Sequence, residues 1–147
     1  MRLGRVGVGR NSFRLGVTDS SAYLAAFDAA AIQVTPPSTG PRGDLDCTAS
    51  AELTCGELGF EIYLPVQGGV ASPDGVRLAR EALARIVDLD DIARAIEDSI
   101  ESDEELAYVT VGDGEVAMHY YATTVNSEWD VVFRRDGSGR WICDGIR

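Results

Sequence analysis

Lysine is absent from this 147-residue chain: all 13 basic residues are arginine, against 24 acids, for a formal net charge of -11. Proteins that bind duplex nucleic acid gain affinity by neutralising phosphates with basic side chains. The acid excess therefore argues against a DNA or RNA partner and favours a basic protein partner, or simple solubility. Arginine without lysine is typical of a GC-rich prokaryotic genome, and adaptation to high salt explains the same composition.

Histidine, cysteine and long apolar runs are also scarce. The single histidine is His119, and the three cysteines, Cys47, Cys55 and Cys143, lack the short paired spacing of a zinc site. An odd number of cysteines does not fit a secreted disulfide framework and indicates thiols in a reducing cytoplasm. No apolar run approaches the roughly 20 residues of a membrane span. We therefore expect a cytoplasmic protein with no metal, no cofactor and no membrane segment.

Residues 1–46 are predicted to be a poorly defined N-terminal segment. Residues 1–18 hold four arginines and no acid. The apolar stretch 22–27 follows Asp19, a good helix N-cap, and predicts either a short helix or the start of a strand. Residues 36–46 contain three of the five prolines, which predicts a loop and a boundary. The expected domain is 47–147.

That domain is predicted to begin with a β-hairpin. Apolar and polar residues alternate over 49–55 and again over 59–66, as in strands with one buried face. Ser72-Pro73 then predicts the start of a helix. The apolar stripe of this helix and a second apolar stripe that begins at Leu89 would lie on different sides of one straight helix. We expect a break near Asp88, giving two helices or one kinked helix; a continuous helix buried on two sides is the alternative.

The C-terminal third is predicted to be an antiparallel β-meander with strands near 106–111, 115–123, 128–134 and 140–143. Glycine-rich turns separate these strands. Trp129 and Phe133 fall on the buried side of their strand, and we expect Trp141 to join the same core. The predicted fold class is thus α+β, with an N-terminal hairpin, a helical segment and a C-terminal meander.

Motifs for catalysis and ligand binding fail on inspection. The stretch 7–12 ends in serine where a dinucleotide loop needs glycine, and the aspartates of 88–91 are followed by Ile92 at a calcium-ligand position. A His119–Cys143 dyad needs strands that face each other, and nucleophilic catalysis also needs an orienting group and an oxyanion site. We predict no catalytic residues. A small Cys/His-dependent hydrolase or transferase and a structural homo-oligomer subunit are the alternatives.

The acid-rich run is the most distinctive feature of the sequence. Residues 88–105 hold nine acids and one base, Arg94. A solvated helix face explains this pattern, and so does a surface that docks a basic protein partner. On the second interpretation, the partner-binding residues are Asp90, Asp91, Glu97, Asp98, Glu101, Asp103 and Glu104.

The region 47–147 resembles small bacterial domains of unknown function and toxin-immunity proteins. The resemblance lies in the order of the following pieces: Phe60-Glu61-Ile62-Tyr63-Leu64, Ser72-Pro73, Leu106-Ala107-Tyr108-Val109-Thr110-Val111, Tyr120-Tyr121, Val125-Asn126-Ser127-Glu128-Trp129 and Trp141. It implies a non-enzymatic protein-binding role, such as that of an immunity protein or inhibitor, and supplies no catalytic residues.

Overall fold

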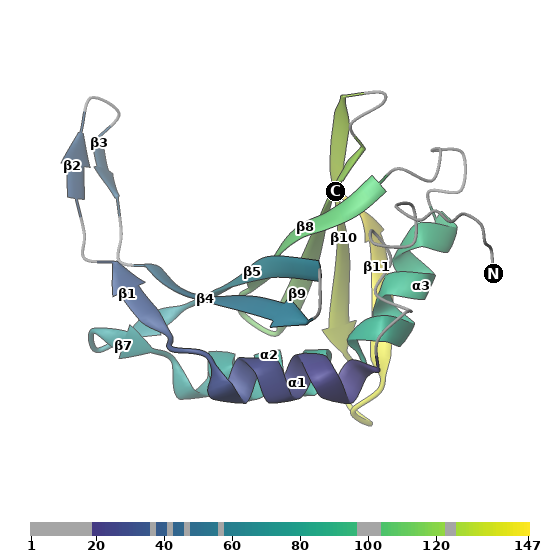
Figure 1. The fold of residues 1–147 in the computed structure, drawn as a ribbon, viewed down its shortest axis with the longest axis horizontal. Helices are drawn as coiled ribbons and strands as arrows, with labels where there is room; N and C mark the ends of the chain where they lie inside the picture. The colour runs from purple at the N-terminus through teal and green to yellow at the C-terminus, as the bar shows by residue number, and fades with distance from the viewer. Residues whose placement is uncertain are drawn as a thin grey trace.

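The computed structural model describes residues 19–35, 38–40, 43–45, 48–55, 58–96, 104–122 and 126–147. In chain order the elements are α1 (Ser20–Ala29), β1 (Gln33–Thr35), β2 (Ser38–Gly40), β3 (Gly43–Leu45), β4 (Thr48–Cys55), β5 (Leu58–Leu64), β6 (Val66–Gln67), β7 (Val70–Ala71), α2 (Pro73–Leu83), α3 (Ile86–Ile96), β8 (Glu104–Val111), β9 (Glu115–Ala122), β10 (Ser127–Arg135) and β11 (Trp141–Ile146). The α+β class is confirmed (Figure 1).

The main sheet has seven strands in the order β1-β4-β5-β8-β9-β10-β11. Neighbouring strands in this sheet are antiparallel, except that β5 and β8 are parallel. The chain passes from β5 to β8 through α2 and α3. The predicted hairpin is β4–β5 and the predicted meander is β8–β11, but they are not separate units. The parallel β5–β8 pair joins them into one sheet, and α1 and β1 precede the hairpin.

The helical segment consists of two helices, with the break at Ala84–Arg85 and not near Asp88. Ser72 caps α2, because its Oγ accepts a hydrogen bond from the backbone N–H of Gly75 at 3.2 Å. The break falls three residues earlier than predicted, and Leu83 and Ile86, on either side of it, are both fully buried. Asp88 lies inside the first turn of α3 and pairs with Arg85.

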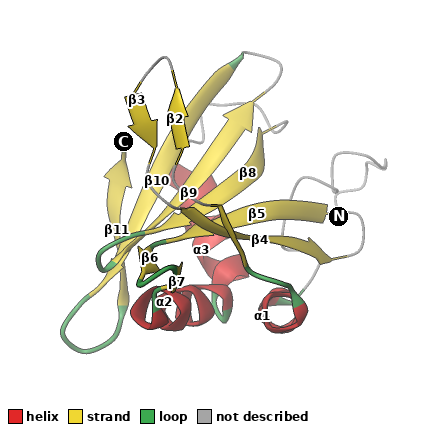
Figure 2. Cartoon of the chain, turned by 90° about the vertical axis from the view of Figure 1, so that its left-hand side faces the viewer, coloured by secondary structure: helices red, strands yellow, loops and turns green. Residues whose placement is uncertain are grey.

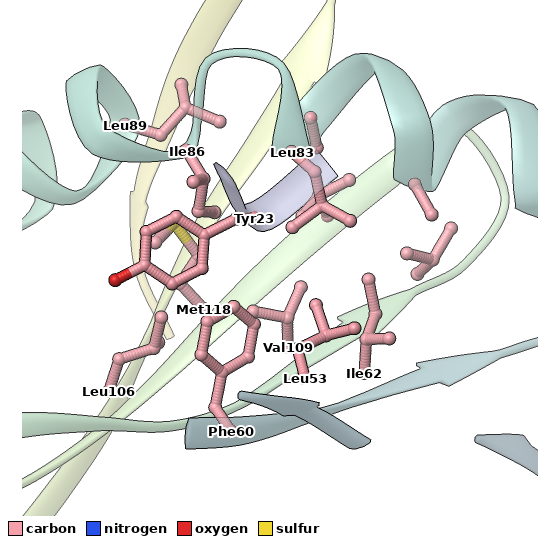
Figure 3. Packing of buried hydrophobic residues seen from close by; sticks show 14 of the residues in the cluster. Tyr23, Leu53, Phe60, Ile62, Leu83, Ile86, Leu89, Leu106, Val109 and Met118 are labelled. Atoms are coloured by element: carbon pink, nitrogen blue, oxygen red, sulfur yellow. The ribbon is translucent and has the colours of Figure 1, made fainter. Parts of the chain in front are cut away.

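The core lies between the helices and one face of the sheet (Figure 2). Tyr23 of α1 stacks on Phe60 of β5 with ring centroids 5.8 Å apart, and Figure 3 shows them among buried side chains from α2, α3, β4, β8 and β9. Because Tyr23 is fully buried, the packed unit extends upstream of residue 47 to include α1.

The predicted core positions of the meander are confirmed. Trp129 is 9% exposed and Phe133 is 1% exposed. Trp141 is half-buried, packs against the core and lies under the guanidinium of Arg135 at 5.3 Å. Gly114 and Gly139 occupy the two predicted turns with φ of 72° and 86°, a conformation that glycine adopts at least cost.

Two small features complete the fold. The segment predicted as a loop at 36–46 contains the β2–β3 pair, which points away from α1 and α2 (Figures 1 and 2). No helix within the described residues has the length and apolar character needed to cross a membrane.

Candidate functional site

Asp90 does not belong to an exposed acidic surface, which corrects the sequence-based prediction. Its carboxylate is fully buried, and both of its oxygens lie 3.0 Å from Nε of Arg94. The hydroxyl of Tyr120 donates to Asp90 at 2.6 Å, and the Arg94 guanidinium lies 5.2 Å from the centre of the Tyr120 ring. A buried carboxylate needs such partners, and Arg94 supplies one from four residues along the helix.

The other predicted partner-binding residues are only partly placed. Asp91 is exposed on α3. Glu104 is the first residue of β8, where the backbone alone is described. The remaining four, Glu97, Asp98, Glu101 and Asp103, lie outside the described residues.

The sheet has a second face, which the helices do not cover, and we call it the open face. It follows from strand alternation: in β9, for example, Met118 and Tyr120 are buried against the helices while His119 and Tyr121 point the opposite way. Cross-strand pairing extends this face from β4 to β10. Its residues are Ser50, Glu52, Thr54, Glu61, Tyr63, Glu105, Tyr108, Thr110, Glu115, Ala117, His119, Tyr121, Glu128, Asp130, Val132 and Arg134.

Three rings form a row at the centre of the open face. Tyr108 stacks on His119 with ring centroids 4.3 Å apart and an interplanar angle of 11°. Tyr63 meets Tyr108 edge to face at 5.6 Å. These three residues, the aromatic row, come from β5, β8 and β9. The parallel β5–β8 pairing is what brings Tyr63 beside Tyr108.

Carboxylates lie at both ends of the aromatic row. Nδ1 of His119 lies 2.5 Å from an Asp130 oxygen, and its Nε2 lies 3.1 Å from a Glu128 oxygen. At the other end Glu61 accepts a hydrogen bond from the Tyr63 hydroxyl at 2.7 Å, and Glu52 lies directly across from Glu61 on β4. We refer to Glu52, Glu61, Glu128 and Asp130 as the four carboxylates.

Both tyrosines of the row remain neutral phenols near neutral pH. The hydrogen bond to Glu61 raises the pKa of Tyr63 above its ordinary value. Burial raises the pKa of Tyr108, with further contributions from the charges of Asp130 and Glu128. These residues therefore offer ring surface and hydroxyl groups to a ligand, and not a base.

The four carboxylates lack arginine partners among the described residues, in contrast to most of the acids on the helices. Each helix acid in the following pairs contacts an arginine: Asp28–Arg80, Asp74–Arg77, Glu81–Arg135, Asp88–Arg85 and Asp90–Arg94. Near β11, Glu115 and Asp144 are likewise paired, with Arg147 and Arg134. Carboxylates without an arginine partner are thus concentrated around the aromatic row.

A pocket of about 300 Å³ adjoins this charge at the β1 side of the sheet. Glu52 and Glu61 form one wall, and Gln33 and Ser50 add polar groups. Ala30 and Ala31, which follow α1, close the edge. The pocket suits a cationic group with several N–H donors, since its polar walls offer mainly oxygen acceptors.

The dyad considered from the sequence is not formed. His119 pairs across the strands with Asp130, whereas Cys143 pairs with Phe133, whose ring is buried on the helix side. The two side chains therefore lie on opposite faces of the sheet. Within the described part of the chain, no group of three or more His, Cys, Asp or Glu side chains could hold a metal ion; Cys47 lies outside it.

Comparison with known proteins returned no matching family model, no matching curated protein and no matching solved structure.

Glu52→Thr is expected to raise the free energy of unfolding by a few tenths to about 1 kcal/mol, because like charges directly opposite on neighbouring strands repel. Urea unfolding measures this change. Glu128→Thr is the matched control: Glu128 lies across from Tyr121 and has no opposing acid, so no gain is expected. Equal effects of the two substitutions would show that the Glu52–Glu61 pair is not repulsive.

Proposed function

We propose that this protein is a non-enzymatic protein-binding domain that docks a basic surface of its partner on the open face. The single observation that carries the proposal is the set of four carboxylates, which surrounds the aromatic row without arginine partners in the described structure. On the helices, by contrast, Asp28, Asp74, Glu81, Asp88 and Asp90 each contact an arginine.

Two properties of the open face favour a macromolecular ligand. Tyrosine rings are frequent anchors at protein interfaces, because they combine a large apolar area with a polar hydroxyl group. Complementary charge around such anchors accelerates association and disfavours wrong partners. A cationic surface with apolar side chains among its charges would satisfy both properties.

One residue of the acid-rich run lies on the open face. Glu105, near the start of β8, lies across from Tyr121 on the open face. Glu105 therefore brings one acid of the run to the proposed docking side. The proposal thus moves the docking surface from α3, where Asp90 is buried, to the open face of the sheet.

The proposal includes a role as an immunity protein or inhibitor, because such proteins act by binding and need no catalytic group. The resemblance of region 47–147 to toxin-immunity proteins supports this choice. A toxin with a basic surface is the partner class that it implies.

Reversing charge on the open face tests the proposal. In the double variant Glu52→Arg, Glu128→Arg, we expect binding of the native partner to weaken by about tenfold or more, chiefly through slower association. Wild-type affinity should also fall as salt rises from about 50 to 500 mM, because screening then acts over a few Å. The partner is first captured from the native host and identified, and its dissociation constant is then measured with purified proteins.

The control variant carries the same change in charge elsewhere. Asp19 and Asp113 are exposed and lie off the open face, so Asp19→Arg, Asp113→Arg should leave binding close to wild type. Equal loss of binding in both variants would show that net charge, and not the position of the charges, determines binding. Loss in the control alone would move the interface away from the open face.

A further inference from the structure

We infer that the partner contacts the open face through arginine side chains and not through lysine. This inference rests on the proposed function and specifies the chemistry of the partner's contacting groups. It concerns how the four carboxylates and the aromatic row act together.

The protein itself shows how a guanidinium is held by one carboxylate and one ring. Arg94 bonds to Asp90 while lying over the Tyr120 ring, at 5.2 Å from the ring centre. Arg135 donates to Glu81 at 2.5 Å and lies 5.3 Å from the centre of the Trp141 ring. In both cases the guanidinium contacts an acid and lies over an aromatic ring.

The open face presents the same two components, and among the described residues no arginine contacts its four carboxylates; Arg134, at the far end of β10, pairs with Asp144. At one end Glu61 adjoins Tyr63, and Glu52 stands opposite Glu61 beside the 300 Å³ pocket. At the other end Asp130 and Glu128 adjoin His119, which stacks on Tyr108. Each end thus pairs carboxylate oxygens with ring surface.

Arginine fits this combination better than lysine does. The guanidinium is planar, donates two parallel hydrogen bonds to a carboxylate and stacks on aromatic faces. The lysine ammonium is a compact, strongly hydrated charge that gains attraction from the carboxylates but little from a flat ring. Charge alone would therefore not distinguish the two residues, whereas charge combined with ring surface does.

Two synthetic peptides test the inference with the full chain. One alternates glycine and arginine, and the other alternates glycine and lysine at the same length and charge. Fluorescence anisotropy measures the affinity of each peptide for the wild type and for Tyr63→Leu, Tyr63→Phe and the double variant Glu52→Arg, Glu128→Arg. Thermal unfolding confirms that each variant is folded.

We expect the arginine peptide to bind the wild type about two- to fivefold more tightly than the lysine peptide, as one exposed cation–π contact provides. The preference should disappear in Tyr63→Leu, which lacks the ring, and persist in Tyr63→Phe, which keeps it. Both peptides should bind the double variant weakly.

The other outcomes separate this inference from the proposed function. Equal binding of the two peptides to the wild type, lost in the double variant, would overturn the arginine preference and leave the open face as the docking surface. A preference that survives in Tyr63→Leu would overturn the role of the Tyr63 ring. Absence of binding, or binding unaffected by the double variant, would overturn both the inference and the assignment of the open face.

Discussion

Asp90→Ala is expected to lower the free energy of unfolding by about 3–5 kcal/mol, because removing one member of a buried ion pair leaves the other charge in a poorly solvated site. The Arg94 side chain is 3% exposed, and its Nε lies 3.0 Å from both oxygens of the Asp90 carboxylate. The substitution removes both contacts. The buried hydroxyl of Tyr120 also loses its hydrogen bond to Asp90. Urea unfolding monitored by circular dichroism measures the change.

Asp88→Ala is the matched control for this substitution. Asp88 lies on the same helix and also pairs with an arginine, Arg85, but their side chains are 59% and 63% exposed. An exposed ion pair contributes only about 0–1 kcal/mol, so the control should be nearly silent. If Asp90→Ala cost no more than Asp88→Ala, the buried cluster around Asp90 would not exist in solution.

Trp129→Ala is the second substitution with a large expected effect, a loss of about 3–5 kcal/mol that prevents folding if the protein is marginally stable. Trp129 is 9% exposed and stacks on Tyr120 with ring centroids 6.0 Å apart. Alanine at this position leaves a large cavity at the end of the core. Thermal and urea unfolding of the purified variant measure the loss.

Trp129→Phe separates the ring from its N–H group. In the described structure the buried indole Nε1 has no hydrogen-bond partner, so replacing it with a phenyl ring removes an unsatisfied donor. We therefore expect a much smaller loss than for alanine. An unchanged melting temperature in Trp129→Ala would instead place the ring at the surface, where it would act as a binding anchor.

Strand alternation was the most reliable guide to the fold. It placed Ala51, Leu53, Phe60 and Ile62 on the buried side of the hairpin and Phe133 in the core of the meander, because a strand with one covered face must alternate. The N-cap at Ser72 was also predicted correctly from the sequence, because serine is a favoured N-cap residue and proline is favoured at the first helical position.

The predictions that were incomplete or wrong concern features that depend on contacts between segments distant in the sequence. Tyr23 and Phe27 are spaced four apart in α1, and that spacing alone did not distinguish a helix from a strand start. The helix becomes part of the core by packing against β4 and against Phe60 of β5. Asp90 was misplaced because it was assigned to the side of the helix that faces away from the apolar stripe beginning at Leu89. The spacing of Asp90 and Arg94, four residues apart, was the available sign of a buried pair.

The aromatic row could not be found from sequence because it depends on strand order. Tyr63 and Tyr108 become neighbours only because β8 returns parallel to β5 after the two helices. His119 was considered for catalysis with a thiol, but its partners are Asp130 and Glu128 on the adjacent strand. A sheet-order prediction would have been needed to place these residues together.

The measurement that most directly locates the binding surface is an NMR titration of the isotope-labelled full chain with the glycine–arginine peptide. The aromatic ring signals of Tyr63, Tyr108 and His119 report on the open face, and the backbone signals of α3 and residues 97–103 report on the acid-rich run. Docking on the open face predicts that the three ring signals shift together and saturate with a single dissociation constant. Shifts confined to α3 and residues 97–103, with the ring signals unmoved, would contradict it.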